Sequence, residues 1–426
     1  MFLWLVFGSF AFLLLIGVPI GAALGLSSAV VIYTIMKLPL IVVTQRMFTA
    51  IDSFSFMAIP FFMLAGSFMA SGGVTRRLVN FANSLVGFIR GGLALVVSVT
   101  GMFFAAISGS SAATTAALGS TLFDEMEKTG YKRDFAAAII ASGGTTGIVI
   151  PPSITLVVFG VTAGVSIGDL FLGGFAPGII MGVSMCILSY FLCKKKGIQS
   201  KGKLSLLNIL KSFRDSFLAL MMPVIILGGI YGGIFTPTEA AAVAAVYGLI
   251  IGMFVYKELT LKKLPSVILK AAVSTTVIMF IVGGANLFGW ILTNAQVPHK
   301  VATFMTSIST NPIVFLMLVN VLLLFVGTLI NASAAVVILV PILFPVALSF
   351  GINPIFFGVL MIVNLAIGCI TPPVGLDLFV VSGIAKLPIE KITKAVFPYL
   401  IVLILDLLLI TYFPQIILFI PHLLGR

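Results

Sequence analysis

Two short motifs of glycine, proline and hydroxyl residues interrupt apolar stretches of the chain. They read GIVIPPS at residues 147–153 and GCITPPV at residues 368–374. A proline pair removes backbone N–H donors and disfavours helical geometry at the preceding residue. Upstream carbonyl groups therefore lose their helical partners, and hard cations prefer carbonyl and hydroxyl oxygens as ligands. Each motif predicts a broken helix that could bind a cation; a proline kink repaired by a neighbouring helix is the alternative.

Each motif is preceded by an apolar run with a small polar interruption. The run at 92–122 contains ISGSSAATT, and the run at 313–350 contains GTLINASAA. Both runs are too long for one comfortable span of about 20 residues. We expect each to form a re-entrant hairpin, two short helices that meet at a polar tip. For the second, longer run, two full helices joined by a tight turn are an alternative.

The composition places the whole chain in a bilayer. Of 426 residues, 60% are hydrophobic and 8% are charged, and the mean hydropathy is +1.27. A soluble domain could not bury so much apolar surface. The net charge of +12 comes from short basic patches between apolar runs, which is typical of cytoplasmic loops and does not indicate nucleic-acid binding. Cys186, Cys193 and Cys369 lack the spacing of a disulfide framework or a metal site.

The chain repeats itself at a constant offset. Four pairs of equivalent residues are 221 positions apart: Phe135 and Phe356, Gly147 and Gly368, Pro151 and Pro372, and Pro177 and Pro398. One offset held through an unusual motif indicates two structural halves.

The loop charges indicate that the halves have opposite orientations. Residues 124–134, before the first motif, carry Lys and Arg, whereas the equivalent residues 349–353 carry no charge. After the motifs the distribution of charge reverses. Residues 163–168, after the first motif, are uncharged, whereas the second motif is followed by Lys386, Lys391 and Lys394. By the positive-inside rule, the first broken helix enters from the cytoplasm and the second leaves toward it.

These observations predict an all-α polytopic membrane protein built from two inverted-topology repeats. The first repeat spans 1–193, with its hairpin at about 92–122 and its broken helix at about 135–163. A basic cytoplasmic linker and interfacial segment covers 194–215. The second repeat spans 216–426, with its hairpin at about 313–350 and its broken helix at about 354–384. We expect another interfacial helix between Arg76 and Arg90.

Inverted repeats with broken helices are typical of secondary transporters, in which unwound carbonyls coordinate a cation and half-helix N-termini face an anionic substrate. The hairpin tips carry no ionisable side chain, and proton relays need Asp, Glu or His within the spans. The sequence therefore favours sodium over protons as the coupling ion. Two His and three scattered Cys do not make the site of a membrane enzyme. A channel would show a continuous polar pore lining instead of two occluded breaks.

Five spaced motifs resemble the large membrane subunit of the tripartite ATP-independent periplasmic (TRAP) transporters, over essentially the whole chain. They are SFSFMAIPFFMLAGSFMASGG (53–73), SGSSAATTAALG (108–119), PPSITLVVFGV (151–161), GIFTPTEAAAVAA (233–245) and GCITPPVGLDLFVVSGIA (368–385).

The resemblance implies an elevator-type, sodium-coupled importer of an organic acid anion in the bacterial inner membrane. Its partners would be a small membrane (Q) subunit and a periplasmic substrate-binding (P) protein. Residues 254–264 and 413–424 further resemble the branch that imports sialic acid. A transporter for C4-dicarboxylates or other sugar acids, and a stand-alone sodium/anion symporter, are alternatives.

The resemblance also implies site residues. The first sodium site would use Ala105, Ser108, Gly147, Ile150 and Pro152, and the second Gly327, Gly368, Thr371 and Val374. The substrate carboxylate would meet Ser108, Ser110, Ser153 and Asn331. Many relatives have Asp in the second tip, so any role that needs a negative charge at Asn331 is in doubt. Close packing of the hairpins is the alternative role for the serine hydroxyls.

Other polar residues favour structural roles. Thr236 and Glu239 fit a capping box with Pro237 at the first helical position, and Asp52 is expected to cap a helix N-terminus. Asp377 lies beyond Pro373 toward the cytoplasmic side, where a role away from the site is favoured. Asp406 lies deep in the last long span, and the sequence suggests no role for it.

Overall fold

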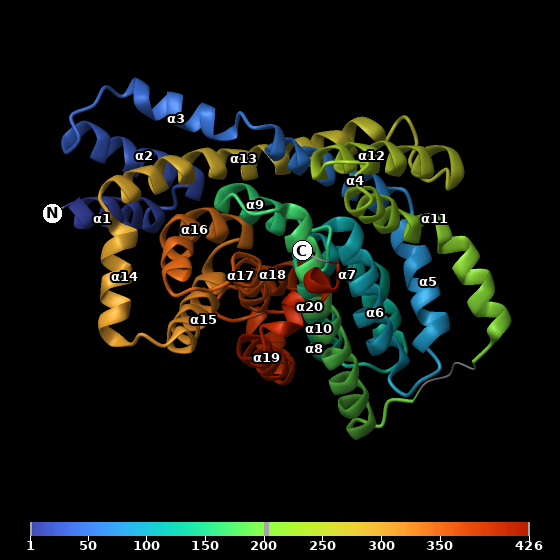
Figure 1. The fold of residues 1–426 in the computed structure, drawn as a ribbon. Helices are drawn as coiled ribbons and strands as arrows, with labels where there is room; N and C mark the ends of the chain where they lie inside the picture. The colour runs from blue at the N-terminus through green and yellow to red at the C-terminus, as the bar shows by residue number, and fades with distance from the viewer. Residues whose placement is uncertain (1, 200–203, 425–426) are drawn as a thin grey trace.

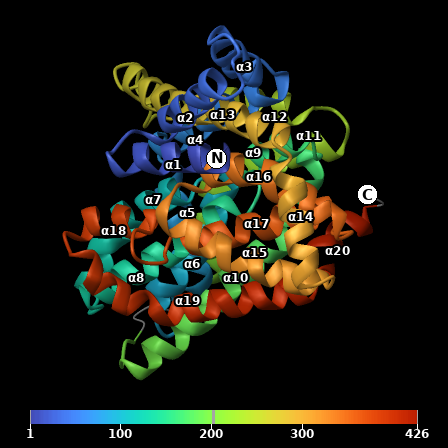
Figure 2. The same ribbon diagram turned by 90° about the vertical axis from the view of Figure 1, so that its left-hand side faces the viewer.

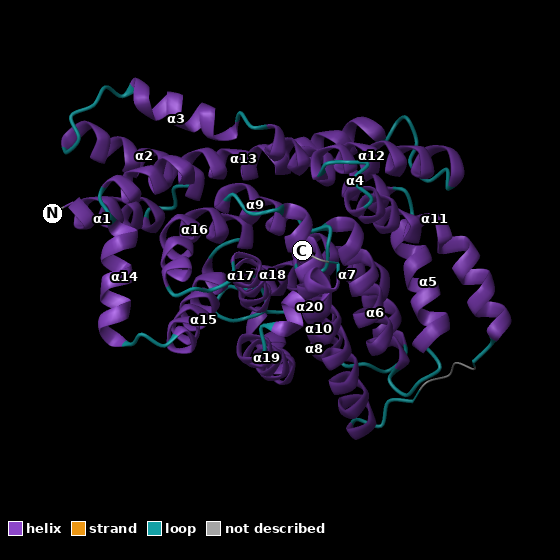
Figure 3. Ribbon diagram, viewed as in Figure 1, coloured by secondary structure: helices purple, strands orange, loops and turns teal. Residues whose placement is uncertain are grey.

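The computed structural model describes residues 2–199 and 204–424, which form α-helices and short helical turns without a β-strand (Figure 3). Eight helical segments in this part of the chain are long and apolar enough to cross a membrane. The expected all-α polytopic fold is confirmed. The helices are α1 (Phe2–Leu15), α2 (Ile20–Thr34), α3 (Ile41–Ile51), α4 (Ala58–Ser71), α5 (Val74–Val86), α6 (Gly92–Ser108), α7 (Ser111–Lys128), α8 (Arg133–Gly144), α9 (Ile154–Ala163), α10 (Ile167–Lys195), α11 (Leu206–Tyr231), α12 (Pro237–Ile250), α13 (Leu264–Asn294), α14 (Val297–Ile308), α15 (Pro312–Leu329), α16 (Ala332–Ser349), α17 (Pro354–Gly368), α18 (Leu376–Ala385), α19 (Ile389–Tyr412) and α20 (Gln415–Leu423), with short turns η1 (Phe54–Met57), η2 (Thr145–Ile148) and η3 (Ile251–Val255).

The helices form two sets, which we call the frame and the inner bundle. The frame consists of α1–α5 and α11–α14, and the inner bundle of α6–α10 and α15–α20. In Figure 1 the blue and yellow frame helices surround the inner bundle on three sides, with the long helix α13 lying along the top. Helix α13 packs on α2, α3 and α4 within the frame and on α16 of the inner bundle. Figure 2 shows α19 on the side of the inner bundle away from α1–α3.

The two halves of the inner bundle are inverted relative to each other. Arg133, at the start of α8, donates a hydrogen bond of 2.7 Å to the carbonyl oxygen of Ala385, at the end of α18. The Lys196 Nζ, after the end of α10, lies 4.8 Å from the centre of the Phe135 ring. A Cβ on Gly173, near the start of α10, would lie 3.2 Å from the Ile355 side chain at the start of α17. Helices α8 and α17 therefore enter the bundle from opposite ends, as the loop charges predicted.

Both proline motifs break a helix. In the first half, α8 ends at Gly144 and the chain restarts as α9 at Ile154. In the second half, α17 ends at Gly368 and α18 restarts only at Leu376. The peptide bond between the two prolines is cis in each motif.

The apolar runs before the breaks form the helix pairs α6–α7 and α15–α16. Helices α15 and α16 are each long enough to span a membrane, and their turn lies against the second break inside the bundle. The choice between a re-entrant hairpin and two full helices for this pair stays a prediction. Helix α7 continues past residue 122 to Lys128, and residues 206–215 are the first turns of the long helix α11. Part of the expected linker, 200–203, lies outside the described residues. The division into repeats at 193 and 216 stays a prediction.

One predicted cap is confirmed and the other is wrong. The Glu239 carboxylate accepts a hydrogen bond of 2.8 Å from the Thr236 N–H, and the Thr236 hydroxyl accepts one of 3.3 Å from the Glu239 N–H. Together they form the expected capping box. Asp52 instead ends α3, because Ser53 adopts the extended conformation that precedes the 3₁₀ turn η1.

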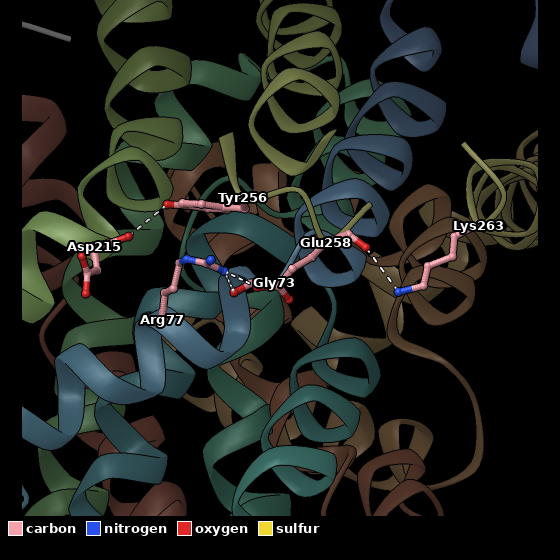
Figure 4. A network of polar contacts seen from close by, with 6 residues as sticks. All are labelled: Gly73, Arg77, Asp215, Tyr256, Glu258 and Lys263. Atoms are coloured by element: carbon pink, nitrogen blue, oxygen red, sulfur yellow. Dashed lines mark hydrogen bonds and ion pairs between the residues drawn. The ribbon is translucent and has the colours of Figure 1, made fainter. Parts of the chain in front are cut away.

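Helix α5 is amphipathic, as expected for the segment between Arg76 and Arg90, and it packs against α6 and α11. Figure 4 shows that Arg77 of α5 contacts Tyr256 and Glu258, in the segment that follows α12 and η3. The Arg77 guanidinium donates to the Glu258 carboxylate (2.7 Å) and lies 3.7 Å above the centre of the Tyr256 ring. The position of α5 at a membrane interface stays a prediction.

The inverted arrangement predicts which loops a membrane-impermeant thiol reagent can reach. In a chain whose native Cys186 is replaced by Ser, Gly164→Cys and Ser349→Cys should be labelled from the periplasm. Thr129→Cys and Glu390→Cys should be labelled only after the membrane is opened. All four positions are exposed, so burial would not explain a missing signal. Labelling of Thr129→Cys and Gly164→Cys from the same side would contradict the inverted topology.

Candidate binding site

The tip of the first hairpin is bonded to the point where the first broken helix restarts. Gly109 joins α6 to α7, and its carbonyl oxygen accepts a hydrogen bond of 3.3 Å from the Ile154 N–H. Its φ of +60° lies in the left-handed region, and a Cβ at this position would lie 2.9 Å from the Pro152 carbonyl oxygen. Glycine therefore satisfies both the turn and the close approach of the two segments.

The second half repeats this contact. The Gly375 N–H donates a hydrogen bond of 3.1 Å to the Thr328 carbonyl oxygen at the end of α15. Gly375 lies 221 positions after Ile154, so the donors are equivalent in the two halves. The backbones of Gly327 and Gly368 also meet, since a Cβ on Gly368 would lie 2.6 Å from the Gly327 Cα. Each hairpin tip is thus held against its own helix break.

At the first break, two backbone carbonyl groups lose their helical hydrogen bonds, and one of them gains a new donor. Pro151 has no N–H for the Gly147 carbonyl, and Pro152 has none for the Ile148 carbonyl. The Ser153 hydroxyl donates a hydrogen bond of 2.6 Å to the Ile148 carbonyl oxygen instead. The Gly147 carbonyl has lost its helical partner and is therefore the better candidate for a cation ligand.

The residues predicted for the first sodium site lie at this contact of tip and break. Ala105 and Ile150 share one small buried cluster. The Ser108 hydroxyl lies 2.8 Å from the Thr114 hydroxyl. A Cβ on Gly147 would lie 2.6 Å from the Thr114 hydroxyl oxygen and 2.6 Å from the Ser110 carbonyl oxygen in the hairpin tip. Carbonyl and hydroxyl oxygens of this kind suit a hard cation without a carboxylate.

The residues predicted for the second sodium site also surround one contact. Gly327 touches Gly368, and the Thr371 N–H donates to the Gly368 carbonyl oxygen (3.0 Å). The Thr371 hydroxyl donates to the Ile367 carbonyl oxygen (2.8 Å). Val374 directly precedes Gly375, which is bonded to the tip. A carbonyl oxygen has two lone pairs, so that of Gly368 could still bind a cation. The assignment of sodium to both sets stays a prediction.

A cavity of about 310 Å³ lies between the two tips, the two breaks and the frame. Its walls come from both hairpin tips, from the restarts of α9 and α18, and from α4 and α13. The described residues that line it include none with a charged side chain: Met63, Gly109, Ser110, Ser111, Ile148, Ile154, Thr155, Val273, Ser274, Val277, Ile278, Asn331, Ala332, Ser333, Cys369 and Leu376.

Four helices begin at this cavity. Ser111, Ile154, Ala332 and Leu376 are the first residues of α7, α9, α16 and α18, and all four line it. A helix N-terminus presents free N–H groups and the positive end of the helix dipole. Four such ends in a cavity without charged side chains favour an anion.

The cavity separates the predicted substrate residues into two groups. Ser110 and Asn331 line it, and each side chain also caps the helix that follows. Ser108 and Ser153 do not line it, since the Ser108 hydroxyl faces Thr114 and the Ser153 hydroxyl is held within its own break. Their contact with substrate stays a prediction.

Four polar residues of the cavity were missed in the sequence: Ser111, Thr155, Ser274 and Ser333. The Thr155 and Ser333 hydroxyls lie 3.4 Å apart and join the two halves. Thr155 follows its helix cap Ser153 by two residues, and Ser333 equally follows its cap Asn331 by two, so both lie in the first turn of a helix that starts at the cavity. This first-turn position was the feature of the sequence that could have identified Thr155 and Ser333 as cavity residues. Nothing in the sequence places Ser274 of α13 beside these residues.

Comparison with known proteins agrees with these features. The model of the family described as the tripartite ATP-independent periplasmic transporter, DctM component, matches residues 7–416. The isethionate TRAP transporter permease protein DctMQ of Oleidesulfovibrio alaskensis is 47% identical over 97% of this chain, which spans 65% of that relative. The C4-dicarboxylate TRAP transporter large permease protein DctM of Pseudomonas aeruginosa is 43% identical over 95% of this chain and 94% of its own. The sialic acid TRAP transporter large permease protein SiaM of Vibrio cholerae is 41% identical over 96% of each chain.

Among solved structures, the fold resembles the YdaH transporter of Alcanivorax borkumensis. The TM-score is 0.59, the sequence identity is 15%, and the match covers 85% of this chain and 86% of that one. This similarity supports the fold alone.

The glycine contacts predict a matched set of stability effects. Gly147→Ala and Gly368→Ala should each lower the free energy of unfolding by about 1–3 kcal/mol, because the new methyl group meets backbone atoms that cannot move aside. Gly228→Ala, in helix α11 with nothing within 4 Å of the new Cβ, should not lower it. The thermal unfolding midpoints of the purified proteins measure the difference. Equal midpoints for all three variants would contradict the close packing of tip and break.

Proposed function

Because the chain belongs to the DctM family, the large permeases of the TRAP transporters, we propose that it couples sodium entry to the uptake of an organic acid anion. Members of this family are transporters of the bacterial inner membrane, and the chain is a multi-pass protein of that membrane. Its work is thus translocation rather than enzymatic conversion. To this family membership, the proposal adds sodium as the coupling ion, an organic acid anion as the substrate, and an elevator motion as the mode of transport.

The cavity with four helix N-termini is the observation that carries the proposal. Backbone N–H groups and the hydroxyls of Ser110, Thr155 and Ser333 can bind a carboxylate or a sulfonate there without a buried Arg or Lys. After the substrate leaves, an uncharged cavity costs less to move through a bilayer than one with a buried cation would.

Sodium as the coupling ion is supported by the chemistry of the two contacts between tip and break. Each brings together carbonyl and hydroxyl oxygens, and each lies directly beside the cavity. A cation bound at Gly147 or Gly368 would hold tip and break together and so fix the adjoining helix N-termini in place. Substrate binding and cation binding would therefore favour each other, as linkage requires.

An elevator motion is supported by the border between the frame and the inner bundle. Both tips and both breaks belong to the inner bundle, whereas α13 presents Val273, Val277 and Ile278 to the cavity, with Ser274 as its polar residue there. An apolar wall loses few hydrogen bonds when it slides. The inner bundle would carry the substrate past α13 as one body.

The proposal includes the partners of a tripartite system. These are a small membrane (Q) subunit and a periplasmic substrate-binding (P) protein that delivers the anion. The relatives named above serve isethionate, C4-dicarboxylates and sialic acid, at identities from 47% to 41%. Similarity alone therefore does not favour the sialic acid expected from residues 254–264 and 413–424, and the substrate class is an organic acid anion.

Uptake into proteoliposomes tests the proposal. The chain is reconstituted with and without its partners, and radiolabelled isethionate, succinate and sialic acid are compared under an inward sodium gradient. We expect uptake of one of these acids with sodium and little with potassium or a proton gradient. Uptake that follows the proton gradient instead would exclude sodium coupling.

Ser110, which caps α7, and Ser120 within α7 provide a matched pair of variants. Ser110→Ala should reduce uptake at subsaturating substrate about ten- to a hundred-fold, because a hydrogen bond to a charged group is worth about 1.5–3 kcal/mol. Ser120→Ala, on the exposed face of the same helix, should leave uptake unchanged. Equal uptake by the two variants, at equal membrane expression, would place the substrate outside this cavity.

A further inference from the structure

Asp377 is a buried acid without a hydrogen-bond partner. It is the second residue of α18, its exposed fraction is 0%, and neither carboxylate oxygen has a hydrogen-bond partner within 3.5 Å. No Lys, Arg or His in the described chain forms an ion pair with it. The N-terminal end of α18 favours a negative charge, but that does not replace the hydrogen bonds which a buried carboxylate needs.

The groups around this carboxylate are oxygens and one thiol. The hydroxyls of Ser111 and Thr115, one turn apart on α7, are the polar side chains that face it. The Ser111 hydroxyl donates instead to the Cys369 sulfur, at 3.6 Å. The Thr115 hydroxyl is buried, and although it faces the carboxylate it forms no hydrogen bond of 3.5 Å or shorter. Two adjacent buried groups, one of them an acid, are therefore left unsatisfied where α7 of the first half meets α18 of the second.

From this geometry we propose that Asp377, Thr115 and Ser111 form a third binding site for a monovalent cation, occupied by sodium. Carboxylate and hydroxyl oxygens are hard ligands. One carboxylate balances one positive charge, so a monovalent ion leaves the site neutral, whereas a divalent ion would leave a buried net charge. These three side chains are distinct from the residues of the two sodium sites expected from the sequence.

The location of the site gives it a role in coupling. Ser111, Cys369 and Leu376 line the cavity, so Asp377 lies directly behind its wall. A bare carboxylate there would repel an anionic substrate, and a bound cation would cancel that repulsion. The inference rests on the proposed sodium-coupled function, and it adds one ion that must bind before or with the substrate.

Equilibrium binding of ²²Na⁺ to the purified full-length chain in nanodiscs tests the site directly. Asp377→Asn should bind one sodium ion fewer per chain than the unaltered protein. Thr115→Val keeps the shape and the carboxylate but removes one ligand, and should weaken one site at least tenfold. Asp406→Asn is the control, because Asp406 is also a buried acid of a membrane helix but accepts a hydrogen bond of 2.9 Å from Ser184. It should bind as many ions as the unaltered protein.

The possible outcomes separate this inference from the proposed function. An unaltered protein that binds no sodium would overturn sodium coupling as a whole. Sodium binding that is identical in the unaltered protein and in Asp377→Asn would overturn the third site alone. The same binding curves recorded from pH 6 to pH 8 complete the test. If Asp377→Asn removes a pH dependence but no sodium ion, the occupant is a proton and the sodium site is overturned.

Discussion

The site depends on one pair of backbone hydrogen bonds, in which each hairpin tip accepts a bond from a residue at the start of the second part of the neighbouring broken helix. In the first half the Gly109 carbonyl accepts from Ile154, and in the second the Thr328 carbonyl accepts from Gly375. In a membrane interior, such groups have no water to replace a lost partner. These two bonds therefore fix where four helices begin, and the cavity and the proposed cation sites follow from that placement.

The breaks use their prolines differently. In the first half the Ser153 hydroxyl donates a hydrogen bond to the Ile148 carbonyl oxygen, and the helix resumes at the next residue, Ile154. In the second half the Asp377 N–H donates a hydrogen bond of 2.9 Å to the equivalent Cys369 carbonyl oxygen, and the helix resumes one residue later than in the first half, counted at the offset of 221. That longer connection carries Asp377 into the interior beside α7. The asymmetry gives the second half an acid that the first half lacks.

Sequence reasoning found the local features and missed the ones that depend on tertiary contacts. Proline pairs, inverted loop charges and the capping box at Thr236 are local signals, and they predicted the breaks, the orientation of the halves and the start of α12. The direction of the Ser153 hydroxyl depends on a carbonyl freed five residues earlier, and Ser274 reaches the cavity only because α13 crosses the inner bundle. Asp377 was expected away from the site, because the sequence does not show that α18 turns inward at Gly375.

Amide hydrogen exchange at the two contacts tests most directly whether tips and breaks form one cation-dependent unit. Exchange of the purified protein is followed by mass spectrometry in sodium and in an equal concentration of choline, with peptides from α13 as the internal reference. Sodium should slow exchange in peptides that cover 105–114, 147–156, 326–333 and 368–378, and leave the α13 peptides unchanged. Equal exchange of those four regions in the two salts would contradict the central claim.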